Sequence, residues 1–547
     1  MNVPNQRNKS VNVHDFAMNP RADVPRSQFN LSHGWKSTFS FSYLVPILLE
    51  PVLPGDTFTC AIQVAARTAI PIVPVQDNWH LEFFSFFVPM RLVWTNAPKF
   101  WGEQDNPGDS TSYTIPVANP TAGYATGSVQ DYMGLINIGQ NGATTWTHNN
   151  LPLRAYNLIY NKWFRDENLQ NSVTVDMGDG PDTPANYILK ARGKRFDYFT
   201  QALPWPQKGA TPISLPLGTT AVVKTSGSQL FTGAQAALTV RDTVAGGIVG
   251  NALLASQVAT GTLASSNSAP GTVGTNQFYP SNLFADLTTA TAATINQLRT
   301  AITLQQYLEK DARGGTRYVE YNYTHFGVRS PDARLQRPEF IGGGRADILT
   351  TAIPQTSATG LTGGSSPIGT LAASGHVNGR SGFTYSSTEH GYIITLACAR
   401  ADLTYQQGLR RLWSVSTRYD WPVPLLANLG EQSLLNREIY SDGSANDANV
   451  FGYIPRWDEW RHSPSQITGI YRSTAAGTID YWHSSQKFTG VPTLNATFIE
   501  DDAKTVTQRN FAAGASSAGQ QLLADIYFTL KVARALPLYG IPGLTRL

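Results

Sequence analysis

Two adjacent carboxylates between tryptophans could carry out acid–base chemistry in this chain. Asp458 and Glu459 lie between Trp457 and Trp460, and a pair of carboxyl groups beside stacking rings is typical of sites that cleave carbohydrate chains. Neighbouring residues on a strand, however, point to opposite faces. We therefore interpret this stretch as part of a protein interface and keep a carbohydrate site as the alternative.

Three aspartates in the motif DMGDGPD have side chains suited to binding a cation. Asp176, Asp179 and Asp182 could hold Ca²⁺ through carboxylate oxygens, but they lack the alternating ligand pattern of an EF-hand loop. A solvated acidic turn is the preferred interpretation. The nine histidines are dispersed, with no H-E-x-x-H pair, which argues against a zinc site. We expect no cofactor.

The common catalytic motifs are missing from the sequence. Neither G-x-x-x-x-G-K-[ST] nor G-x-S-x-G occurs, so a phosphate-binding loop and a hydrolase nucleophile are not indicated. Cys60 and Cys398 are too few for a disulfide framework, and their apolar alternations predict buried, reduced thiols. We find no signal peptide and no apolar run long enough to span a bilayer. These features favour a protein that is not an enzyme, is made in a reducing cytoplasm and is not inserted into a membrane.

Basic and aromatic residues are interleaved in two places. Residues 1–35 are rich in Pro, Asn and Ser and carry an excess of positive charge, which predicts an extended basic arm. In the second place, three cations precede Phe196, Tyr198 and Phe199. Cations neutralise phosphates while rings stack on bases, so both places are candidates for contact with single-stranded DNA. The candidate residues are Arg7, Lys9, Arg21, Arg26, Trp35, Lys36, Arg192, Lys194 and Arg195. Ion pairing with a neighbouring subunit is the alternative for the last three.

The composition favours extensive subunit contact. Charged residues make up 14% of the 547 residues and aromatic residues 11%, whereas typical domains contain roughly 25% charged residues. Few charges and many rings are characteristic of interface cores. A large β-rich monomer with many loops is the alternative that composition alone leaves open.

Strand signals dominate the sequence and lie far apart. Alternation of apolar residues predicts strands in 36–50, 57–70, 79–88, 391–405 and 524–535. Strands early and late in the chain, separated by long excursions, indicate a single jelly roll with long inserted loops. Apolar residues at helical spacing predict helices at 153–167 and 294–310.

The clearest change in composition begins at residue 207. Residues 207–292 contain few charges and much Ala, Gly, Thr and Ser, which predicts an inserted surface loop. We accordingly divide the chain into an arm (1–35), a first part of the jelly roll (36–206), the insertion (207–292) and the remainder of the jelly roll (293–547). Residues 356–382, rich in Gly, Ser and Thr, are predicted to form a long loop. Side chains of the insertion that could take part in packing or binding are Val222, Phe231, Leu238, Arg241, Phe278 and Tyr279.

Long, irregular motifs spread over nearly the whole chain carry a resemblance to a known family. They are PVLPGDTF (51–58), FFSFFVPMRLVW (83–94), RGKRFDYFTQALPWPQKG (192–209), DARGGTRY (311–318), HFGVRSPDARLQRPEF (325–340), TEHGY (388–392), RADLTYQQGL (400–409), GEQSLLNREIY (430–440) and PSQITG (464–469). The chain resembles the major capsid protein of the Microviridae, of the gokushovirus type.

The resemblance implies a mainly β fold, an eight-stranded antiparallel viral jelly roll. It also implies self-assembly through pentamers into a T=1 icosahedral shell around a circular single-stranded DNA genome. The expected location is the virion, assembled in the cytoplasm of a bacterial host. Further implied partners are minor virion or scaffolding proteins and a receptor on the host surface. In such proteins an insertion just after ALPWPQKG forms a protrusion at the threefold axis, so residues 207–292 are the candidate for host attachment. The competing hypothesis is a β-sandwich carbohydrate-binding protein or glycosidase.

Overall fold

The computed structural model of this chain describes residues 26–209, 222–225, 240–242, 278–280, 283–286, 295–314, 318–327, 336–354, 371–426, 429–512 and 521–538. The chain divides into two compact units. The first contains residues 1–206 and 314–547, and the second contains residues 207–313.

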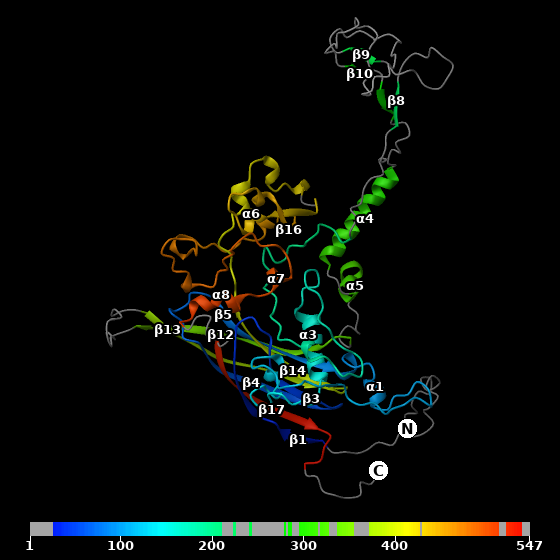
Figure 1. The fold of residues 1–547 in the computed structure, drawn as a ribbon, viewed down its shortest axis with the longest axis vertical. Coiled ribbons are helices and arrows are strands. Elements are labelled where there is room, and N and C mark those ends of the chain that lie inside the picture. Colours follow the sequence, from blue (N-terminus) through cyan, green and yellow to red (C-terminus); the bar gives the residue numbers. More distant parts are fainter. Residues whose placement is uncertain are drawn as a thin grey trace, which may run out of the picture. The chain divides into compact units, whose positions relative to one another are not determined.

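A curled antiparallel sheet is the framework of the first unit (Figure 1). Its strands are β1 (Ser27–Asn30), β2 (His33–Phe39), β3 (Val45–Val52), β4 (Thr57–Thr68), β5 (Trp79–Pro89), β12 (Glu339–Pro354), β13 (Leu371–Ser386), β14 (Gly391–Ala401) and β17 (Leu522–Arg534). The order is β1-β17-β4-β13-β12-β5-β14-β3, and β2 also pairs with β17. The first half of β12 pairs with β5 and its second half with β13. This mainly β architecture is consistent with the predicted jelly roll.

One apolar core fills the curl of the sheet. Alternate residues of β4 and β17 point into it, because successive side chains of a strand face opposite sides. Phe41, Phe58 and Phe528 all belong to this core and are fully buried. The prediction that early and late strands share one core is therefore confirmed.

The predicted strand at 36–50 is wrong in one respect, because it is broken into β2 and β3. Ser42 has a positive φ of 74°, a conformation that few residues other than glycine adopt. Its amide donates to the carbonyl of Ala399, and its hydroxyl accepts from the amide of Lys504. The break moves the chain from one half of the sheet, where β2 pairs with β17, to the other, where β3 pairs with β14.

The two longest strands, β12 and β13, were missed by the sequence analysis. The predicted loop at 356–382 is wrong from Leu371 onward, since β13 pairs with both β4 and β12. Its glycines are sites of close packing: a Cβ atom at Gly375 would overlap Thr68, and one at Gly379 would overlap Ala346. These glycines therefore allow close packing within the sheet and do not mark a turn.

The remaining elements of the first unit cover the sheet or form a lobe beyond it. They include β6 (Val117–Ala118), β7 (His148–Asn149), β15 (Glu431–Leu435), β16 (Val450–Pro455), α1 (Ala97–Phe100), α2 (Val129–Tyr132), α3 (Leu151–Ile159), α5 (Tyr318–Phe326), α6 (Asn436–Ile439), α7 (Ala496–Ile499) and α8 (Ala503–Val506). The helix α3 continues as a π-helical turn to Phe164, so the helix predicted at 153–167 is confirmed. A second apolar cluster joins α3 to β5 and β14, and a third lies in the lobe around β15, β16 and α7.

The second unit contains α4 (Ile295–Arg313), which confirms the helix predicted at 294–310. Its described strands are β8 (Val222–Thr225), β9 (Val240–Asp242), β10 (Phe278–Pro280) and β11 (Leu283–Asp286). They form two antiparallel pairs, β8 with β11 and β9 with β10.

Candidate functional site

The arm candidates fall at the edge of the described residues. Arg7, Lys9 and Arg21 lie outside them, and Arg26, the first one described, is exposed. In β2, Trp35 is half-buried against the main core. Lys36 forms an exposed ion pair with Asp525, with 3.0 Å between Nζ and Oδ2. The structure thus assigns these two residues a role in attaching β2 to the fold.

The cations of the loop at 192–195 are held by carboxylates of their own chain. Glu82 on β5 accepts from both Arg192 and Arg195, the latter at 2.9 Å, and its carboxyl lies 3.2 Å from the ring of His80. Burial opposes the ionisation of Glu82, but hydrogen bonding from His80 and the charge of Arg192 hold its pKa well below the usual value. Arg195 also contacts Asp402 at 3.1 Å. The loop is therefore fastened to the sheet by ion pairs within the chain.

Lys194 turns inward from the same loop. Its ammonium lies 4.1 Å from the ring centre of Phe498 and donates to Gln486 at 2.9 Å. Burial lowers the pKa of Lys194 to about 8, because the charged form loses hydration. Phe196, by contrast, is 82% exposed. The ammonium of Lys194 is therefore engaged by groups of its own chain and is not directed toward solvent, where it would contact a phosphate.

A cleft of about 540 Å³ adjoins this loop. Its walls combine aromatic rings with guanidinium groups, from Phe84, Phe86, Trp163, Phe164, Phe196, Phe340, Arg192, Arg195 and Arg400. Rings beside cations are the chemistry that holds unpaired bases. The sequence analysis found the cations and Phe196, but not the rings, because Phe84, Phe164 and Phe340 come from three distant segments.

The interpretation of the acidic motif as a solvated turn is wrong for Asp182, although residues 177–181 are exposed. This residue is buried, and Arg154 of α3 reaches it through two nitrogens, Nη2 at 2.5 Å and Nε at 2.7 Å. Tyr187 donates to the same carboxylate at 2.7 Å, and Asn150 donates to it as well. Burial opposes the charge, but the hydrogen bonds from Arg154 and Tyr187 hold the pKa of Asp182 below the usual value. The aspartate balances a buried arginine.

The other two aspartates of the motif also have local roles. Asp179 accepts from the indole of Trp94 at 2.7 Å and from the amide of Asn96 at 3.0 Å, and these bonds lower its pKa. Asp176 accepts from the backbone of Gly178 at 2.9 Å. Among the residues the structure describes, no three His, Cys, Asp or Glu side chains lie close enough together to hold a metal ion.

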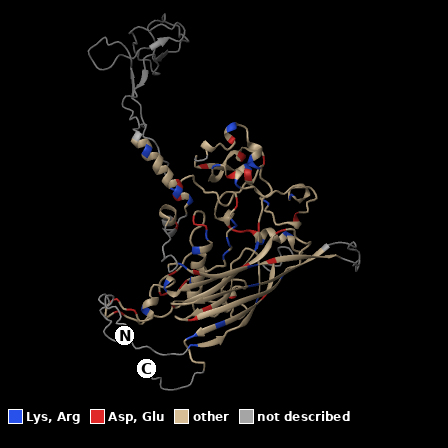
Figure 2. Ribbon diagram, turned by 180° about the vertical axis from the view of Figure 1, so that it is seen from behind, with Lys and Arg blue, Asp and Glu red and all other residues tan. Residues whose placement is uncertain are grey.

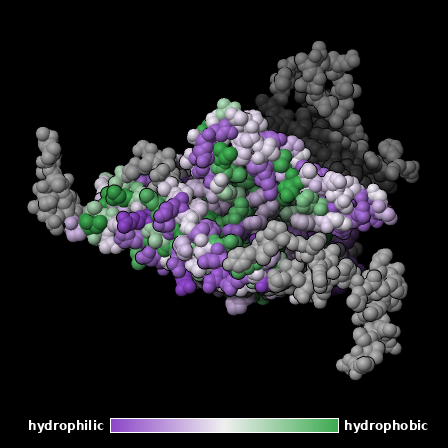
Figure 3. Space-filling model, turned by 90° about the horizontal axis from the view of Figure 1, so that it is seen from below, coloured by the Kyte–Doolittle hydropathy of each residue, from purple (hydrophilic) through white to green (hydrophobic). Residues whose placement is uncertain are grey.

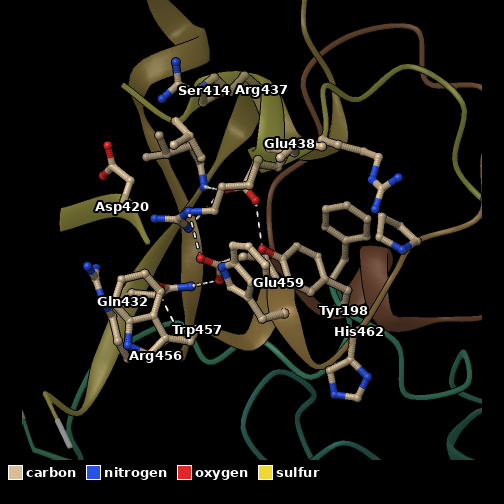
Figure 4. A pocket seen from close by; sticks show the side chains of 18 residues that line it. Tyr198, Ser414, Asp420, Gln432, Arg437, Glu438, Arg456, Trp457, Glu459 and His462 are labelled. Atoms are coloured by element: carbon tan, nitrogen blue, oxygen red, sulfur yellow. Dashed lines mark hydrogen bonds and ion pairs between the residues drawn. The ribbon is translucent and has the colours of Figure 1, made fainter. Parts of the chain in front are cut away.

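One of the two carboxylates between the tryptophans, Glu459, lines a pocket in the lobe (Figure 4). Asp458 and Glu459 lie on a single 3-10 turn, Asp458–Trp460, and not on a strand as assumed from the sequence. Glu459 accepts from Gln432 at 2.5 Å and lies 3.7 Å from Arg411, while Asp458 accepts from Gln201. Both carboxylates are therefore engaged in holding the lobe together.

Glu438 is a further carboxylate that lines this pocket. Tyr198 donates to it at 2.8 Å and Arg411 contacts it at 3.3 Å. Burial raises the pKa of Glu438 although the charge of Arg411 opposes the shift. The sequence analysis did not identify this residue, since its partners lie in segments far away along the chain.

Both cysteines are buried and free, as predicted. Burial raises the pKa of the Cys60 thiol and that of the Cys398 thiol to about 12, so neither is a thiolate near neutral pH. Within the described part of the chain, no helix has the length and apolar character needed to cross a membrane.

Comparison with known proteins decides what kind of molecule this fold belongs to. Residues 17–544 match the phage protein family described as "Capsid protein (F protein)". The chain belongs to this capsid protein family. The chain is also similar to proteins named "Capsid protein VP1": it is 43% identical over 539 residues to that of Bdellovibrio phage phiMH2K, covering 97% of this chain and 98% of the relative.

Two further relatives carry the same name. The protein of Chlamydia phage 1 is 39% identical over 600 residues, covering 98% of this chain and 99% of the relative. That of Spiroplasma virus 4 is 36% identical over 554 residues, with 98% and 99% covered. The resemblance to Microviridae capsid proteins is confirmed. This protein is a phage capsid protein, a component of the virion that assembles with further copies of itself.

A capsid subunit must bury surface against its neighbours, and this chain exposes much apolar surface. Apolar residues lie among polar ones over the face seen from below (Figure 3). Charged side chains concentrate in the lobe, while the strands of the sheet carry few (Figure 2). Large exposed apolar side chains of the sheet include Leu349, Ile353, Leu523 and Tyr527. Surfaces of this kind indicate protein contact.

Proposed function

We propose that this capsid protein builds a T=1 icosahedral shell that encloses a circular single-stranded DNA genome. The observation that carries the proposal is the family match over residues 17–544, nearly the full chain, on a single curled β framework. The cleft beside Arg192 and Phe196 supports contact with unpaired bases. The three relatives are named as capsid proteins, and the shell geometry and genome type are our proposal for this chain.

The basic arm is proposed to lie along the inside of the shell and to contact DNA or a neighbouring subunit. Its support is the excess of cations over Asp15 and Asp23 in residues 1–35, since phosphate neutralisation needs cations and not a fixed structure. In the structure, residues 27–30 and 33–35 of this arm belong to β1 and β2, so a deletion of residues 2–25 leaves every described strand in place.

One experiment tests the shell and the arm together. Full-length protein and the 2–25 deletion are produced in phage-infected cells, and particles are examined by electron microscopy and for nuclease-protected DNA. We expect closed T=1 shells containing single-stranded DNA from the full-length chain, and shells with less DNA or lower heat stability from the deletion. Shells of another geometry would contradict the T=1 proposal, and filled, heat-stable particles from the deletion would contradict the role of the arm.

The insertion at 207–292 is proposed to project from the shell at the threefold axis and to attach to the host. The sequence supports this through its low charge and small residues, which permit change without disturbing the sheet. Of its candidate residues, Val222, Arg241, Phe278 and Tyr279 lie in the short strands β8, β9 and β10. The candidates Phe231 and Leu238 lie outside the described residues.

Exchange of the insertion between two related phages tests this role. If residues 207–292 attach to the host, adsorption and host range should follow the transplanted segment, because the sheet that carries it stays the same. Adsorption that follows the parental shell, in particles that assemble normally, would show that the insertion is a structural cover only.

A further inference from the structure

The strongest unexplained surface lies in the lobe, along the segment between β14 and β15. The described part of this segment contains only three 3-10 turns, at 411–414, 418–420 and 424–426. Its apolar side chains point outward: Trp413 is 73% exposed and Leu425 is 88% exposed. We call the following residues the apolar lobe surface: Leu412, Trp413, Tyr419, Trp421, Val423, Leu425 and Trp460. Trp421 and Trp460 lie with 5.4 Å between their ring centres. Several large apolar side chains exposed along one short segment indicate an interaction site.

Three arginines accompany the apolar lobe surface without a carboxylate ion pair among the described residues. Arg410 donates to the hydroxyl of Ser463 at 3.1 Å, and Arg418 donates to the hydroxyl of Tyr419 at 2.7 Å. Arg456 lies 4.1 Å from the ring centre of Trp457 and donates to a backbone carbonyl at 3.1 Å. Arginine beside tryptophan and tyrosine is the composition of interface hot spots.

The pocket of Figure 4 lies within the same part of the lobe. It has a volume of about 250 Å³, and Leu412, Trp460, Arg410 and Arg456 are among its lining residues. Its lining thus shares residues with the exposed surface and with the unpaired arginines. The carboxylates Asp420, Glu438 and Glu459 also line the pocket, and Arg411 is paired with the last two. With Trp457 and Trp460 beside them, the hollow is suited to receive a side chain from a partner.

An acidic loop elsewhere on the first unit has a charge opposite to that of the lobe arginines. After α1, residues 101–108 are all exposed. The loop carries three carboxylates, Glu103, Asp105 and Asp109, and the nearby cation Lys99 lies 3.4 Å from Asp105. The loop begins with Trp101, which is half exposed. It lies at the α1 end of the unit, well away from α6 and β16 in Figures 1 and 2.

We infer that the apolar lobe surface binds the acidic loop 101–109 of a second copy of this chain. The inference rests on the proposed function, since it names a contact within the shell. The two surfaces differ and lie apart on one copy, so they form a head-to-tail contact, which repeats around a symmetry axis when its rotation closes. Arg410 and Arg418 then face Glu103 and Asp105, and the apolar side chains of the lobe become buried.

A second copy explains the surface better than DNA does. Arginines and tryptophans alone would suit a single strand, but Leu412, Val423 and Leu425 offer no ring on which a base can stack. Membership of a capsid protein family supplies the self-association. The negative charge of the acidic loop complements the arginines of the lobe. A nucleic acid is also an anion, so it could bind the arginines but would leave the acidic loop without a partner.

A charge exchange across the contact tests the inference. The full-length chain is made with R410E/R418E, with E103R/D105R, and with all four substitutions, and assembly is measured by sedimentation and electron microscopy. R472E, at an exposed site after the 3-10 turn Gly469–Tyr471 and outside both surfaces, is the control for a change of charge. We expect each double variant to lower the yield of shells by more than about tenfold, because like charges across an interface cost several kcal/mol. The fourfold variant should recover most of the yield, and R472E should assemble.

Each result bears on the contact separately from the shell itself. If R410E/R418E forms shells as well as wild type does, the inference is overturned. It is also overturned if the fourfold variant stays unassembled while each double variant keeps the thermal unfolding temperature of the wild-type subunit. Shells of R410E/R418E that lack DNA would instead assign the surface to the genome. If wild type itself forms no shell, the proposed function fails and not the contact.

Discussion

Replacing Asp182 by alanine is expected to destabilise the subunit by about 3–5 kcal/mol, because it leaves the buried guanidinium of Arg154 without its counter-charge. Arg154 is fully buried, and its side chain donates to Asp182 and to the carbonyls of Val93 and Gly178. The carbonyls cannot neutralise the charge. Urea unfolding of the purified subunit at pH 7 measures the loss, and a yield of shells close to zero is expected at growth temperature.

The control for this prediction is Asp176→Ala, on the same loop. Asp176 accepts a hydrogen bond from the backbone of Gly178 and is only half-buried, so its loss should change the free energy of unfolding by less than about 0.5 kcal/mol. Equal effects of the two substitutions would mean that the loop matters for its backbone and not for the ion pair.

The same ion pair predicts a pH dependence. The pKa of Asp182 is lowered in the folded state, so its stabilisation is present above the unfolded-state pKa of about 3.9 and is lost as the pH falls through the folded pKa. The difference in unfolding free energy between wild type and Asp182→Ala should therefore narrow in acid. A difference that stays constant down to pH 2 would contradict an ionised Asp182 in the folded state.

The sheet could be predicted from sequence where its residues alternate clearly. The strands β4, β5, β14 and β17 lie close to the predicted ranges because large apolar side chains, such as Phe58, Phe86, Ile394 and Phe528, occupy many of their buried positions. The strand β13 could not be found, since its buried positions include Ala373 and Gly375. Small residues carry little hydrophobic signal, although close packing between strands requires them.

The candidate site could be predicted less well, because its chemistry is assembled from distant segments. The sequence placed Arg192 and Arg195 beside aromatic residues, but their partner Glu82 lies more than a hundred residues earlier. Likewise, Asp182 looks exposed in DMGDGPD because Arg154, its partner, is on a helix with no local sign of the pairing. Charged residues in a short motif are therefore a sign of solvent exposure only where no residue of opposite charge, from elsewhere in the chain, is buried beside them.

Phe528→Ala is the substitution expected to disturb the main core most. Phe528 is fully buried on β17, at the register position opposite Ile62 of β4 and His33 of β2, with 5.2 Å between its ring centre and that of His33. Loss of a buried aromatic side chain costs about 3–5 kcal/mol. The strand β17 pairs with β1, β2 and β4. The loss of stability should therefore appear as one cooperative shift of the urea midpoint of unfolding and as failure of the subunit to assemble.

The neighbouring residue on the same strand shows whether burial is the cause. Tyr527 is 49% exposed on the opposite face, where it is paired with Gln63 and Gly34. Tyr527→Ala should cost no more than about 1 kcal/mol, the usual size of a cross-strand contribution, although it removes a side chain of similar size. If both substitutions lowered the unfolding free energy of the isolated subunit equally, β17 would not have one buried and one open face. If only assembly failed in Tyr527→Ala, with the isolated subunit unaffected, the open face of β17 would be covered by another component of the particle.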